Sequence, residues 1–196
     1  MNEFWLYTKI GLHHVLDINA YDHVLFIFAL VTPYIFKDWK KILILVSLFT
    51  IGHTFSLILS VFEIVYIKEN IVEFLIPITI FVTALFNMII LKKSSKSNGI
   101  GFLSLTTLFF GIIHGLGFSN YFKTILPGNA QDKILPLLEF AVGIEFAQII
   151  VVTVALTASY LVQNILKFSK RDWVIGISCF ITGVVLPMII ESEFLK

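Results

Sequence analysis

The run ILPLLEFAVGIEFAQIIVVTVALTASYLVQNIL, residues 134–166, decides the fold class of this chain. Glu139 and Glu145 are its only charged residues. An α-helix rises about 1.5 Å per residue, so roughly 20 apolar residues cross the roughly 30 Å hydrocarbon core of a bilayer. Strands of a membrane barrel are shorter and alternate apolar with polar residues, a pattern that this run lacks. The run therefore predicts a transmembrane helix.

The rest of the chain has the same character. Its 196 residues are 58% hydrophobic and 14% charged, and the mean hydropathy of +0.94 is far above that of a soluble domain. Five further apolar runs lie at about 15–36, 42–62, 71–91, 101–122 and 174–190. We expect an all-α, polytopic membrane protein, a single transmembrane domain over residues 1–196 with about six helices crossing the lipid bilayer. A short interfacial segment, residues 1–12, precedes them.

Basic residues gather in alternate connections between these runs. Three connections hold nine of them: Lys37, Lys40, Lys41, Lys92, Lys93, Lys96, Lys167, Lys170 and Arg171. The other loops and the termini hold five: Lys9, Lys68, Lys123, Lys133 and Lys196. The positive-inside rule then predicts that both termini lie outside, in a bacterial cytoplasmic (inner) membrane. The net charge of +1, without basic blocks, argues against a nucleic-acid partner, whereas a homo-oligomer is compatible with the sequence.

Ionisable side chains fall in the outer half of four expected helices. The residues concerned are Asp22, His23, His53, His114, Glu139 and Glu145, roughly 8–17 Å below the outer face. An ionised carboxylate at the centre of a membrane helix costs roughly 2.5–3.5 kcal/mol. The apolar runs contain no Lys or Arg that could neutralise these acids. A bound cation or a proton must therefore compensate for the charge.

The stretch HHVLDINAYDHVLF, residues 13–26, adds three more ionisable side chains at the mouth of the first helix, His13, His14 and Asp17. His14 and His23 fall on opposite faces of a continuous helix, so they can converge only if the helix breaks. We expect that break at residues 17–21, where Asp and Asn disfavour a helix.

Imidazole nitrogens combined with carboxylate oxygens suit a divalent transition metal ion, namely nickel, cobalt or zinc. The predicted metal ligands are His14, Asp22, His23, His53, His114 and Glu145, with His13, Asp17 and Glu139 as secondary candidates. The same acids and imidazoles are equally compatible with a proton-linked role.

Three motifs resemble the HupE/UreJ family. They are HHVLDINAYDHVLF at 13–26, GHTFSL at 52–57 and FGIIHGLGF at 110–118, and the resemblance covers roughly residues 10–190. The resemblance implies a membrane permease for nickel or cobalt, with about six transmembrane helices and no attached ATPase. Asp22, His23 and His114 are the residues that match the family's motifs.

Two functions from different classes remain open. The first is a permease for a divalent transition metal, which captures the ion outside and holds it at the histidines. The second is a zinc-dependent intramembrane hydrolase, in which Asp22 or Glu145 acts as the base on a lipid-borne or hydrophobic substrate. A metal-sensing or metal-delivery subunit is a third reading. An inner polar path favours transport, and a closed floor with a lateral opening favours catalysis.

Overall fold

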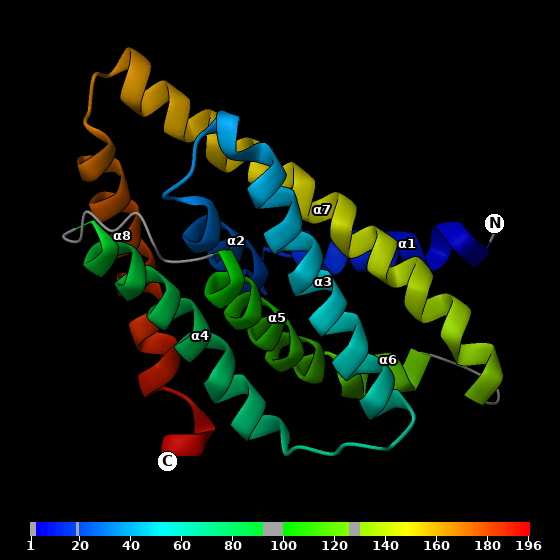
Figure 1. Cartoon of the computed structure of the whole chain (residues 1–196). Coiled ribbons are helices and arrows are strands. Elements are labelled where there is room, and N and C mark those ends of the chain that lie inside the picture. The colour runs from blue at the N-terminus through cyan, green and yellow to red at the C-terminus, as the bar shows by residue number, and fades with distance from the viewer. Residues whose placement is uncertain (1–2, 19, 92–99, 126–129) are drawn as a thin grey trace.

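The computed structural model describes residues 3–18, 20–91, 100–125 and 130–196 (Figure 1). Within these ranges the chain forms helices and no strand, which confirms the all-α class. The helices are α1 (Glu3–Leu16), α2 (Asp22–Val31), α3 (Trp39–Val61), α4 (Glu69–Ile90), α5 (Ile100–Gly117), α6 (Ser119–Ile125), α7 (Ile134–Tyr160) and α8 (Lys170–Ile190). Short 3-10 turns lie at Phe36–Asp38, Ala130–Lys133 and Glu193–Leu195, and a π-helical turn, Leu161–Ile165, extends α7.

Four described segments are long and apolar enough to cross a membrane: Phe36–Val61, Glu69–Ile89, Ile134–Ile165 and Lys170–Ile190. A fifth is available if α5 and α6, bent by 50° at their junction, form one span. The expected count of about six is therefore not confirmed.

The first expected span, residues 15–36, is not one continuous helix. The chain leaves helical geometry after Leu16 and re-enters it at Asp22, so the break falls in the segment 17–21 where the sequence placed it. The α2 helix then holds only 10 residues, roughly 15 Å of rise, which is too short to cross a bilayer alone. A broken helix of this kind places two helix ends inside the protein, where their side chains can meet.

The helices pack in pairs, and glycine residues allow the backbones of two of these pairs to come into contact. Helix α3 runs along α5, α1 along α7, and α4 along α8. A Cβ atom on Gly115 of α5 would overlap the carbonyl oxygen of His53 on α3, and one on Gly143 of α7 would overlap the carbonyl oxygen of Thr8 on α1. Glycine is therefore required at both positions for the backbones to approach so closely.

Helix α2 lies inside the bundle, against α4 and α7 (Figure 1). It is apolar almost all round, and seven of its 10 residues are buried, the pattern of a helix with no exposed face. The first of the seven is His23, at the start of the helix. Burial of this short helix thus carries an imidazole into the centre of the bundle.

Candidate metal centre

Three imidazoles from three helices converge in the interior. His14 is near the end of α1, His23 is in the first turn of α2, and His53 is in the middle of α3. One nitrogen from each ring lies within 4.8 Å of the other two. Three nitrogens bound to one zinc-like ion at 2.0–2.1 Å lie roughly 3.4 Å apart, so a small inward shift of the rings would supply three of the four ligands of a tetrahedral site. We call these three residues the imidazole cluster.

The break between α1 and α2 creates this arrangement. The turn places His14, at the end of one helix, beside His23, at the start of the next, with ring centroids 4.5 Å apart. His53 completes the group at 5.7 Å from the ring of His14 and 5.5 Å from that of His23. Gly115 contributes from α5, because its missing side chain lets that helix press against the backbone of His53.

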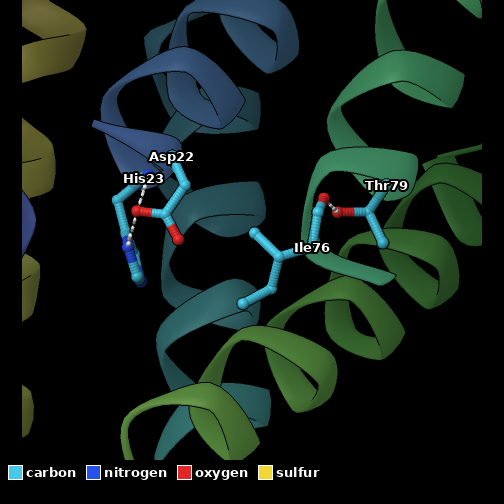
Figure 2. A network of polar contacts seen from close by, with 4 residues as sticks. All are labelled: Asp22, His23, Ile76 and Thr79. Carbon is cyan, nitrogen blue, oxygen red and sulfur yellow. Dashed lines mark hydrogen bonds and ion pairs between the residues drawn. The ribbon is translucent and has the colours of Figure 1, made fainter. Parts of the chain in front are cut away.

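Asp22 orients the His23 ring. Its Oδ1 atom lies 3.1 Å from His23 Nδ1 and also accepts a hydrogen bond of 2.9 Å from the backbone N–H of His23 (Figure 2). This contact engages Nδ1 and leaves Nε2 for another partner. A carboxylate that fixes the far side of an imidazole is the usual support of a histidine metal ligand. Figure 2 also shows the Asp22 carboxylate facing Ile76 of α4, whose carbonyl oxygen accepts a hydrogen bond from Thr79.

Most imidazole nitrogens in this region have no hydrogen-bond partner in the described structure. The unpartnered atoms are His14 Nε2, His23 Nε2, and both ring nitrogens of His53 and His114. His23, His53 and His114 are each at most 1% exposed, so very little of their surface is open to solvent or lipid. A buried polar atom without a partner costs roughly 1–3 kcal/mol, and several in one place indicate a ligand that the rings are built to hold.

Four aromatic side chains pack around the imidazoles. The ring of Phe118 lies 3.8 Å from that of His14, and Phe140 packs 5.6 Å from the same ring. On the other side Phe26 stacks on Phe49 at 4.7 Å. These four phenylalanines could not be singled out from the sequence, because 20 residues of that type are spread along the chain.

His114 lies beside the imidazole cluster on the side of these stacked rings. Its ring is 5.2 Å from His23 and 5.0 Å from Phe49. It does not belong to the group of three whose nitrogens lie within 4.8 Å. His114 therefore lies next to the imidazole cluster and not within it.

A cavity of about 990 Å³ leads from the protein surface to the imidazoles. Its inner wall includes His14, Asp22, His23 and His114. Its outer wall includes the exposed residues Lys9, His13, Asp17, Glu73 and Tyr121. We call this cavity the vestibule. The predicted secondary candidates His13 and Asp17 thus lie along the approach to the site.

The two acids of α7 lie elsewhere. Glu145 accepts hydrogen bonds from the hydroxyls of Ser47 and Thr50 on α3, at 2.6 and 2.5 Å, and it is outside the imidazole cluster. Glu139 is 7% exposed, and its Oε2 atom has no hydrogen-bond partner in the described structure. Neither residue lines the vestibule. The matched spacing of Ser47 with Thr50 and of Glu145 with Gln148 was a signal for this contact that the sequence analysis did not use.

The chain matches the family described as HupE / UreJ protein over residues 1–192. The chain belongs to the HupE/UreJ family. No curated protein and no solved structure matches it. Membership supports metal transport across a membrane at the level of the family. The three HupE/UreJ motifs are far apart in the sequence, yet each brings at least one imidazole to this region: His14 and His23 from the first, His53 from the second and His114 from the third.

Proposed function

We propose that this HupE/UreJ protein is a permease for a divalent transition metal ion, which binds at the imidazole cluster and enters through the vestibule. One observation carries the proposal: buried imidazole nitrogens without partners converge at the inner wall of an open cavity. In this reading Asp22 is a positioning residue for His23, and His114 receives the ion next. The lysine and arginine distribution supports a vestibule that faces the outside of a bacterial inner membrane.

The donor set favours nickel or cobalt, with zinc as the third candidate. Neutral imidazoles bind these borderline ions well, whereas magnesium and calcium require oxygen ligands. Three neutral rings also hold an ion without a fixed counter-charge, and such a site releases its ion more readily than one built from thiolates. The single cysteine, Cys179, is on α8, far along the chain from the three cluster histidines.

Movement of the ion beyond the imidazole cluster requires the stacked rings of Phe26 and Phe49, here called the aromatic floor, to move apart. Phe26 is fully buried, its ring contacts those of Phe49 and His114, and it also lines a second cavity of about 120 Å³. Thr83, Thr106 and Thr107 also line that second cavity, but its lining is almost wholly apolar, because their hydroxyls donate to carbonyls of their own helices. We propose Phe26 as the gate of the permease, because its ring contacts His114 and also lines the second cavity.

The closed floor also favours the alternative function, an intramembrane metal-dependent hydrolase. In a hydrolase the vestibule would admit a substrate to a zinc-activated water, and Asp22 would accept the proton. Because a hydrolase keeps its metal ion at the site, the aromatic floor does not have to open for catalysis. The two functions therefore differ in whether metal ions cross the protein or stay in it.

The deciding experiment uses the purified chain in liposomes. Bound nickel, cobalt and zinc are measured by elemental analysis, and uptake of each ion is measured over time. We expect about one equivalent of bound metal and uptake that is saturable. His23→Ala and His53→Ala should each lower metal affinity at least about 100-fold. His13→Ala, a neighbour of His14 on the exposed wall of the vestibule, is the matched control and should retain affinity within about threefold.

If His53→Ala binds metal with wild-type affinity, the proposal that the metal binds at the imidazole cluster is overturned. Metal that binds at the cluster but never crosses the membrane would overturn the permease. If such a protein also hydrolyses hydrophobic esters or amides, and Asp22→Asn loses that activity, the hydrolase is the function.

A further inference from the structure

A second polar cluster lies between α3 and α7, away from the vestibule. The Oε1 atom of Glu145 accepts a hydrogen bond from Ser47 Oγ at 2.6 Å, and Oε2 accepts one from Thr50 Oγ1 at 2.5 Å. Gln148 Nε2 donates to Thr50 Oγ1 at 2.9 Å. We call these four residues the oxygen cluster, because their side chains offer a carboxylate, two hydroxyls and an amide oxygen.

The oxygen cluster is built from matched spacings. Ser47 and Thr50 are three apart on α3, and Glu145 and Gln148 are three apart on α7. Residues with this spacing share one helix face, so each helix turns two oxygen-bearing side chains toward the other. Both Thr50, 8% exposed, and Gln148, 0% exposed, are buried at the contact.

The charge of Glu145 has no protein partner in these two helices. Helix α7 contains no Lys or Arg, and those of α3, Lys40 and Lys41, lie at its first turn. Two hydroxyl donors reduce the desolvation penalty of a carboxylate but do not remove its charge. A cation or a proton is needed for neutrality.

The amide of Gln148 distinguishes a metal cation from a proton. The hydroxyl of Thr50 has two acceptors in reach, Glu145 Oε2 at 2.5 Å and the carbonyl oxygen of Val46 at 3.2 Å, and its oxygen accepts the amide N–H of Gln148. The Oε1 atom of Gln148 is then buried without a hydrogen-bond partner in the described structure. A proton on Glu145 would neutralise the carboxylate and leave this oxygen unsatisfied. A cation coordinated by oxygen atoms satisfies both groups.

We propose that Glu145, Ser47, Thr50 and Gln148 bind a sodium ion. Oxygen donors alone select a hard cation over nickel or cobalt, and the single negative charge balances a single positive one. Thr50 is three residues from His53 on the same face of α3, so the ion would lie about one helical turn from the imidazole cluster. Sodium binding would then support coupling of metal movement to a sodium gradient, a consequence that rests on the proposed permease function.

The test measures the thermal unfolding midpoint of the purified full-length protein, without transition metal, in sodium chloride, potassium chloride and choline chloride at equal ionic strength. A ligand that binds only the folded protein raises the midpoint, here by roughly 3–6 °C at saturating sodium. Thr50→Val and the near-isosteric Glu145→Gln should abolish this sodium-specific rise. Thr153→Val is the matched control, because the hydroxyl of Thr153 is exposed and bonds only to a carbonyl of its own helix.

Equal midpoints in the three salts would overturn the proposal, as would a sodium-specific rise that Thr50→Val retains. A stabilisation by acid instead of sodium, lost in Glu145→Gln, would overturn it in favour of a proton site. His53→Ala should keep the sodium-specific rise, since the oxygen cluster does not use that ring. Failure of the metal site and failure of the sodium site are therefore seen in separate measurements.

Discussion

Helix α3 carries two polar clusters one turn apart, and they differ in donor, charge and partner helix. His53 joins imidazoles from α1 and α2, all of which offer nitrogen donors. Thr50 joins Glu145 and Gln148 of α7 in an oxygen-donor group that carries one carboxylate. If both proposals hold, one apolar helix selects two classes of cation, and the neighbouring helices decide which donor atoms meet at each turn.

The strongest test of whether the two clusters are separate sites is to remove one member of each cluster from helix α3. His53→Ala should lower nickel affinity at least about 100-fold, because one of three ligands is lost. Thr50→Val should leave nickel affinity within about threefold. Calorimetric titration of nickel into both purified variants checks the difference. Equal losses in the two variants would mean that the clusters are one site.

Removing a charge that only orients a ligand should have a smaller effect. Asp22→Asn preserves the size of the side chain but weakens the contact with His23 Nδ1, so nickel affinity should fall roughly 10- to 100-fold with unchanged stoichiometry. Glu191→Gln, an exposed acid at the end of α8, is the control for the loss of one negative charge. If Asp22→Asn binds fewer nickel ions per protein than the wild type, Asp22 is instead a direct ligand.

The sequence located the ionisable groups well because their cost in a membrane restricts where they can occur. Histidines at similar depths on separate helices predicted a shared site, and the poor helix formers at 17–21 predicted the break that joins His14 to His23. Depth follows from counting residues along a helix, and a single sequence provides that count.

The number of residues along a helix does not show how that helix is rotated about its own axis, and therefore does not show which neighbour each side chain faces. Glu145 was assigned to the histidines from its depth, yet α7 turns it toward Ser47 and Thr50. The orientation of α7 is set by its packing on α1 and α3, where Gly143 fits against the backbone of Thr8. The number of spans is likewise not confirmed, because the length of an apolar run does not show that α2 starts only at Asp22.

A packing variant should separate the clusters by their helix pairs. Gly115→Ala places a methyl group against the carbonyl of His53 and pushes α5 from α3, at a cost of roughly 1–3 kcal/mol. We expect the unfolding midpoint to fall by about 2–8 °C and nickel affinity to fall less than in Asp22→Asn. The sodium-specific rise should persist, because the oxygen cluster lies between α3 and α7. Gly101→Ala, which meets open space on the same helix, should change neither quantity.

The smallest expected effect concerns the vestibule, which serves the imidazole cluster alone. Glu73 is exposed on its wall, and Glu69 and Glu193 lie close enough to act on it electrostatically. Acidic side chains at a mouth raise the local concentration of cations, and salt screens this attraction over about 10 Å at 0.1 M. Glu73→Gln should therefore slow nickel uptake by liposomes about twofold at low ionic strength and not at high ionic strength. The equilibrium affinity for nickel and the sodium-specific rise should stay unchanged, since neither cluster contacts Glu73. A lower affinity in this variant would instead move Glu73 from the approach into the site.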